Sequence, residues 1–115
     1  MESVTFRVKE VHGGFSEAAG MIYVDGDDLV LEVETKLLSL FRRPPKVYRF
    51  ELVDLDAVRY KKGFRHDRLT LRTRPLDAIA DVPGVSEGEL CLLVARKDRD
   101  ALDRLLDRLD LWRAD

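Results

Sequence analysis

The chain offers few side chains that could perform catalysis. Its candidates for a nucleophile or a base are one cysteine, Cys91, and two histidines, His12 and His66, and the histidines fall in separate predicted loops. Zinc sites and Cys-His nucleophile pairs need such residues close together, as in CxxC or a histidine pair one helical turn apart, and neither spacing occurs. We therefore predict no catalytic residue, no metal site and no cofactor, and we expect Cys91 to be a small apolar filler in a buried strand.

Three carboxylates, Asp25, Asp27 and Asp28, cluster around Gly26. Calcium needs several oxygen ligands at regular positions of one loop, with a closing glutamate at a fixed distance. This segment has neither the alternation nor the glutamate. We interpret it as the solvated tip of a β-hairpin, because an Asp-Gly pair favours a tight turn.

Basic side chains gather in the middle of the sequence. Residues 1–41 carry a net charge of −5, residues 42–74 carry +7 and residues 75–115 carry −4, although the whole chain carries only −2. If the basic side chains share one surface, they could hold phosphate groups, nucleic acid or an acidic protein face. The alternative is that they are ordinary outward strand positions that discourage edge pairing. The candidate contact residues are Arg42, Arg43, Arg59, Lys61, Lys62, Arg65, His66 and Arg68.

Alternation of apolar and polar residues predicts short β-strands along most of the chain. We expect a loop or a short helical turn at 16–19 and a connection at 41–46, and 76–82 stays open between strand and turn. Because the connections are short, the strands should pair antiparallel. The predicted strands cover 3–11, 20–24, 29–38, 48–52, 58–61, 69–73 and 89–95.

Helical periodicity is clean only at the end of the chain, from Asp98 to Asp115. Asp98 could cap this helix, and Asp100 with Arg104 would form a pair one turn apart. A helix of this length is marginal alone in water, so its apolar face must pack on a sheet or on another copy of the chain. The residues of that face are Leu102, Leu105, Leu106, Leu109 and Trp112.

Length and composition define the class of protein. The chain has 115 residues, 45% of them hydrophobic and 37% charged, which is typical of one globular domain spanning 1–115. No apolar run reaches the roughly 18 residues of a transmembrane helix, and no export signal is visible at the start. With a single cysteine there can be no internal disulfide, and we expect a cytoplasmic protein.

Together these features resemble the pleckstrin-homology-like (PH-like) superfamily, and bacterial PH-like domains in particular. The resemblance covers a core of about 20–112. It implies an antiparallel barrel or sandwich of about seven strands, closed by the last helix, that serves for binding or assembly. The family's phosphoinositide site uses basic residues at the first hairpin turn, where this chain is acidic. The segments that carry the resemblance are 20–25, 29–34, 52–58, 69–71 and the terminal helix.

Two functional hypotheses follow. The first is a non-enzymatic module for protein association, most simply with itself, because several bacterial PH-like domains form ring-like homo-oligomers and separated charge suits head-to-tail contacts. The alternative is a module that binds anionic ligands, either nucleic acid or phosphorylated lipid headgroups, through segment 42–74.

Overall fold

The computed structural model describes residues 2–11, 16–37, 41–42, 46–74, 79, 82, 85 and 88–113. These residues form one antiparallel sheet and a C-terminal helix, so the predicted mainly β fold is confirmed. The helix is α1 (Arg99–Arg113), directly preceded by the short 3-10 helix η4 (Arg96–Asp98), and a second 3-10 helix is η2 (Leu52–Asp54). The strands are β1 (Val4–Val11), β2 (Ser16–Asp25), β3 (Asp28–Leu37), β4 (Phe41–Arg42), β5 (Lys46–Glu51), β6 (Leu55–Lys61), β7 (His66–Thr73) and β8 (Glu89–Ala95).

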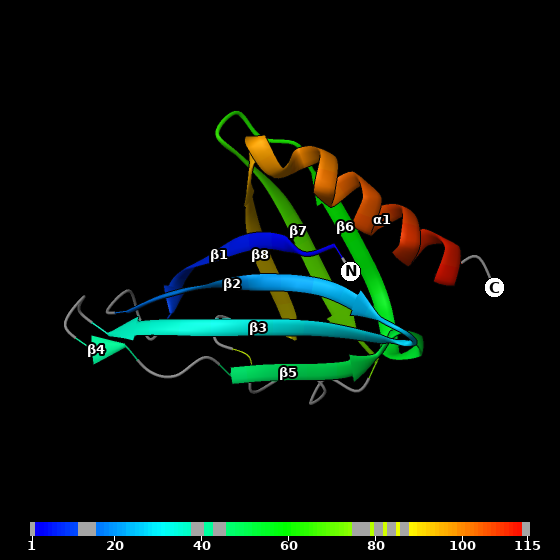
Figure 1. Cartoon of the computed structure of the whole chain (residues 1–115), viewed down its shortest axis with the longest axis horizontal. Coiled ribbons are helices and arrows are strands. Elements are labelled where there is room, and N and C mark those ends of the chain that lie inside the picture. The colour runs from blue at the N-terminus through cyan, green and yellow to red at the C-terminus, as the bar shows by residue number, and fades with distance from the viewer. Residues whose placement is uncertain are drawn as a thin grey trace.

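The sheet has two limbs, one made of β1 to β5 and the other of β6 to β8, and they meet where β1 pairs with β8. Its strand order is β4-β3-β2-β1-β8-β7-β6, and β5 also pairs with β3. Figure 1 shows β2, β3 and β5 running across the molecule, whereas β6, β7 and β8 run steeply to them. The helix α1 packs against β1, β2, β8 and η2, and so it closes the space between the limbs.

The core lies between the two limbs and α1. Inward positions of the strands alternate with exposed ones, as in β7, where Leu69 and Leu71 are fully buried. From the helix, Leu102, Leu105 and Leu109 are buried and Leu106 is half-buried. The predicted leucine face therefore packs on the sheet, and the side chain of Trp112 lies outside the described part of the chain.

The hairpin of β2 and β3 turns through Gly26 and Asp27, as predicted. Asp25 pairs with Asp28 across the turn, and Gly26 has a φ of 62°, in the left-handed region that glycine enters without a steric penalty. Along β3, Leu29 and Leu31 face the core and are fully buried.

Some predictions about local structure were wrong. Residues 16–19 extend β2 instead of forming a loop, because they pair with both β1 and β3. Phe41 and Arg42 form a short strand on β3, not a plain connection. Asp98 is the last residue of η4, directly before the first residue of α1. Arg104 binds Glu2 through two hydrogen bonds of 2.6 Å, and Asp100 adds a weaker electrostatic attraction, which together with Glu2 raises the pKa of Arg104.

The prediction for Cys91 was half right. It lies in β8, but its side chain is exposed, because nothing among the described residues covers that face of the strand at this position. The neighbouring outward residues Leu93 and Ala95 are half-buried, whereas Leu90 and Leu92 on the other face are fully buried.

Candidate anion-binding site

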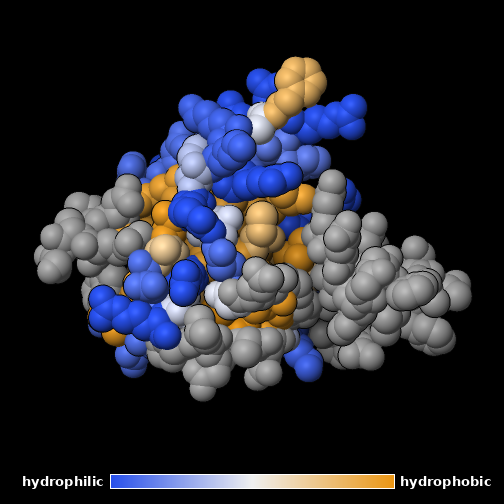
Figure 2. All heavy atoms as spheres, turned by 180° about the vertical axis from the view of Figure 1, so that it is seen from behind, coloured by the Kyte–Doolittle hydropathy of each residue, from blue (hydrophilic) through white to orange (hydrophobic). Residues whose placement is uncertain are grey.

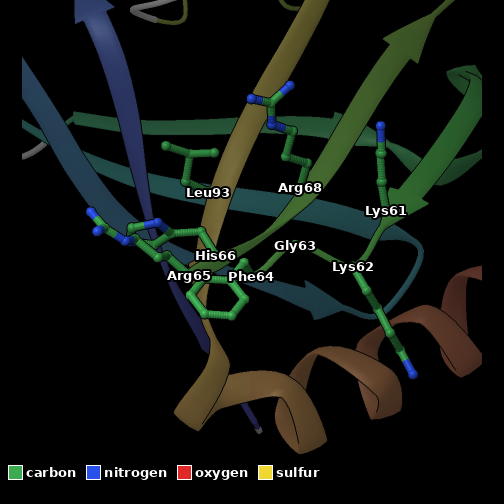
Figure 3. A pocket seen from close by; sticks show the side chains of 8 residues that line it. All are labelled: Lys61, Lys62, Gly63, Phe64, Arg65, His66, Arg68 and Leu93. Atoms are coloured by element: carbon green, nitrogen blue, oxygen red, sulfur yellow. The ribbon is translucent and has the colours of Figure 1, made fainter.

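The loop between β6 and β7 carries a concentration of positive charge beside a hollow of about 400 Å³. Figure 3 shows Lys61 and Lys62 extending in opposite directions, as successive residues at the end of a strand do, while Arg65 and His66 point to the same side. In Figure 2, hydrophilic side chains crowd the end of the molecule that this loop occupies in Figure 1. The hollow is lined by Lys61, Lys62, Gly63, Phe64, Arg65, His66, Arg68 and Leu93.

Strand register extends the positive surface from the loop across the sheet. Lys61 of β6 lies opposite Arg68 of β7, Arg68 lies opposite Leu93 of β8, and Leu93 lies opposite Arg7 of β1. Residues opposite one another on neighbouring strands project from the same face. One row across four strands therefore presents three cationic side chains around a leucine, next to the loop that adds Lys62 and Arg65.

Five of the eight predicted contact residues meet at this hollow: Lys61, Lys62, Arg65, His66 and Arg68. Arg59 lies two residues before Lys61 on β6, opposite Thr70. Arg42 belongs to β4, which pairs with β3 in the other limb, and its side chain is not described. Arg43 lies outside the described residues, as do His12 and most of segment 76–82.

Several arginines of the basic middle are neutralised where they stand. Arg59 forms an ion pair with Glu89, and Arg72 and Arg74 approach Asp56 at 3.9 and 3.8 Å. Each of these arginines thus has a carboxylate within reach.

Arg49 is neutralised in the other limb. It binds Asp25 at 2.9 Å and Asp28 at 3.0 Å, so the acidic hairpin tip serves as its partner. Because these two ion pairs raise the pKa of Arg49, it stays a cation, and its charge is balanced at that tip.

The side chains around the hollow are different. Within the part of the chain that the structure describes, no carboxylate forms an ion pair with Lys61, Lys62, Arg65 or Arg68. Exposed cations that share a concave surface and have no local counter-charge raise the local concentration of anions. The hollow is therefore a place where positive charge remains available to a ligand.

A buried carboxylate holds the loop in place from the side of the core. Asp67 is 0% exposed and accepts two hydrogen bonds from Arg99, at 2.8 and 2.7 Å. It also accepts one from the hydroxyl of Tyr60 at 2.7 Å and one from the backbone N–H of Gly63 at 3.3 Å. These four bonds join the end of β6, the loop, the start of β7 and the start of α1.

The same contacts determine the charge states of the group. The Arg99 guanidinium holds the pKa of Asp67 well below its usual range, helped by the Tyr60 hydroxyl and the Gly63 amide. Burial, together with the hydrogen bond to Asp67, raises the pKa of Tyr60 to about 12. Asp67 is thus an anion and Tyr60 a neutral donor across the physiological range, and the pair with Arg99 stays intact.

The backbone of the loop is fixed at two further points. The Arg96 side chain of η4 donates a hydrogen bond of 3.2 Å to the Phe64 carbonyl. A Cβ atom at Gly63 would collide with the carbonyl oxygen of His66, so the close turn requires glycine there. The result is a tight loop whose tip holds Phe64 out into solvent, 87% exposed.

Three residues of this site, Asp67, Tyr60 and Arg99, were not predicted from the sequence. One of them, Asp67, could have been found from the sequence. It occupies the same alternating positions of β7 as Leu69 and Leu71, whose side chains face the core. A carboxylate at a core-facing position needs a partner, because an unpaired buried charge is costly. The identity of that partner, Arg99, depends on how α1 packs.

Neither a protein-family model nor a curated protein nor a solved structure matches the chain. Among the described residues, no group of three or more histidine, cysteine or acidic side chains could hold a metal ion. No helix in this part of the chain is long and apolar enough to cross a membrane.

Proposed function

We propose that this chain is a non-enzymatic binding module that takes an anionic ligand at the hollow beside the β6–β7 loop. The observation that carries this proposal is the contrast in ion pairing. Arg49, Arg59 and Arg99 are bound to carboxylates, whereas the cations around the hollow are not. The loop is also fixed in shape by Asp67, so a ligand would meet a preformed site at a low ordering cost.

A non-enzymatic role fits the chemistry of this site. It holds cations, one imidazole and two apolar side chains, which can bind and orient an anion. The exposed thiol of Cys91 belongs to another row of β8, opposite Thr70. No arrangement of a nucleophile with a base is present among the described residues of the hollow.

A calorimetric titration with inorganic triphosphate at low ionic strength tests the proposal. The test variant is Lys61→Gln/Lys62→Gln/Arg65→Gln, and the control variant Lys46→Gln/Arg72→Gln/Arg74→Gln removes the same charge away from the hollow. We expect the test variant to lose at least about tenfold in affinity and the control to stay near wild type, because only local cations contact the ligand. Equal weakening of both variants, or no binding by the wild type, would overturn the proposal.

Self-association is the second candidate, and one observation favours it. In the described part of the sheet, β5 pairs only with β3, and it exposes Val47 to 60%. An edge strand with an exposed apolar side chain can accept a strand from another copy. Light scattering during size-exclusion chromatography would detect this, and Val47→Lys should return an oligomer to monomers.

We also propose that the chain belongs to the PH-like superfamily. This proposal is supported by the antiparallel strand order and by the position of α1 between the limbs. The cytoplasm is the compartment that we propose on the grounds of the sequence, with its lone cysteine.

A further inference from the structure

Phe64 is an exposed apolar side chain at the tip of the loop, and the contacts that hold the loop do not require this exposure. Single exposed apolar residues are common on proteins and need no special account by themselves. This one stands out because its surroundings are fixed: Arg96 holds its carbonyl, and Asp67 holds the amide of Gly63 before it. Leu93, half-buried, lines the same hollow, yet Phe64 remains 87% exposed instead of packing closely on it.

The chemistry around Phe64 narrows the choice of partner. Proteins that bind single-stranded nucleic acid stack successive bases on several aromatic side chains. Among the described residues, the exposed large apolar side chains are Phe64, Met21, Val47 and Val53, so Phe64 is the single aromatic. A protein partner would bury such an anchor in a continuous contact surface, but the immediate neighbours of Phe64 in the loop are charged or glycine.

A bilayer surface matches this arrangement. Aromatic side chains are enriched at the interface between headgroups and acyl chains, and lysine and arginine are attracted to anionic headgroups. Lys62 and Arg65 flank the tip that carries Phe64, and Lys61 stands at the end of β6. One projecting ring surrounded by cations can insert while the cations remain at the level of the phosphates.

We propose that the anionic ligand is the surface of a lipid membrane and that the β6–β7 loop docks there by inserting Phe64. This inference rests on the proposed anion-binding function and adds to it the class of partner. Both the charge and the ring contribute: each cation should supply about fivefold in membrane affinity, and the partly inserted ring about tenfold.

Vesicle sedimentation separates these contributions. Vesicles of phosphatidylcholine containing roughly 30% phosphatidylserine provide the anionic surface, and pure phosphatidylcholine vesicles are the neutral comparison. The test variant is Phe64→Ser. The matched control is Val53→Ser, since Val53 is also exposed, to 56%, but lies in η2 at the other end of β6. Each protein is also titrated with inorganic triphosphate.

The expected result is that Phe64→Ser binds the anionic vesicles about tenfold more weakly and binds triphosphate as the wild type does. Val53→Ser should match the wild type in both assays. If Phe64→Ser kept full vesicle binding, or if no protein bound the vesicles while triphosphate still bound, the membrane inference would be overturned and the anion-binding function would stand. Absence of binding in both assays would overturn both.

A fluorescent label gives a second readout that does not depend on affinity. In a Cys91→Ser background, which removes the exposed natural thiol, Phe64→Cys and Val53→Cys each carry one environment-sensitive dye. Insertion predicts a blue shift on anionic vesicles for the dye at 64 and none for the dye at 53. Equal spectra at the two positions would argue against insertion of the loop.

Discussion

At the scale of single residues, the fold depends most clearly on Asp67. This carboxylate is fully buried, whereas the side chain of its partner Arg99 is 26% exposed. The pair therefore crosses from the core to the surface and joins the start of β7 to the start of α1. Because Asp67 also binds the amide of Gly63, the conformation of the basic loop depends on it.

Replacement of Asp67 by asparagine should destabilise the protein by about 2 to 3 kcal/mol near neutral pH, since Arg99 would lose its carboxylate partner. The pKa of Asp67 is lowered in the folded state, below the value of 3.8 that applies when it is unpaired. The stabilisation is therefore complete above that value and is lost as the pH falls below it. Urea unfolding between about pH 7 and about pH 2 would show this.

In that experiment, the free energies of unfolding of wild type and Asp67→Asn should converge as the solution becomes acidic. A constant difference across the whole range would mean that the destabilisation has another cause. Glu2→Gln is a suitable control, because Glu2 pairs with Arg104 at the surface and should contribute much less.

Tyr60 gives the matching prediction at high pH. Its pKa is raised from 10.0 to about 12, so the stabilisation by the neutral hydroxyl is full below pH 10 and is lost as the pH rises toward 12. Tyr60→Phe should cost about 1 kcal/mol at neutral pH and should lose less stability than the wild type over that alkaline interval. Tyr23→Phe removes a hydroxyl whose partner, Glu32, is half-buried and not fully buried like Asp67, so it should have a smaller effect in the same unfolding assay.

The sequence predicted the cations of the site better than the group that holds them. Lys61, Lys62 and Arg65 are close together in the chain, so a count of charge finds them. Asp67 and Arg99 are 32 residues apart, and only the packing of α1 on the sheet brings them together. The alternation of residues along β7 predicts that Asp67 faces the core, but it does not predict which residue pairs with it.

At the scale of elements, alternation succeeded where side chains are large and failed where they are small. Strand β7 was predicted from leucines that alternate with polar residues, and β8 from a run of large apolar residues. The start of β2 contains Ala18 and Ala19, which have low strand propensity, and it forms a strand because two neighbours pair with it. The exposure of Cys91 could not be read from the sequence either, since it depends on which face of β8 is covered.

The leucine face of α1 gives a prediction that compares two positions. Leu102 is fully buried, so Leu102→Ala should lower the free energy of unfolding by about 2 to 5 kcal/mol. Leu106 is half-buried and loses less contact, so Leu106→Ala should cost clearly less. Thermal or urea unfolding of both variants measures this. Equal costs would mean that α1 packs on the sheet with a different face.

At the scale of the whole molecule, charge differs between the two ends of β6. This strand has seven residues, which span roughly 20 Å. Lys61 is its last residue and the basic loop follows, whereas η2 precedes it and binds the β2–β3 turn through a hydrogen bond from the Leu52 amide to the Asp27 carbonyl. At that turn Arg49 is neutralised by carboxylates, so free positive charge is concentrated at the other end.

This polarity predicts the orientation of the molecule on an anionic surface. Hydrogen exchange measured with and without phosphatidylserine vesicles should slow for the amides of residues 62–66 and should not change for residues 25–28 or 47–53. The reason is that the first segment carries the unpaired cations and Phe64, while the others lie at the neutralised end. Pure phosphatidylcholine vesicles should leave every segment unchanged. Protection centred on β5 would instead favour strand addition at that edge, and hence the self-association candidate.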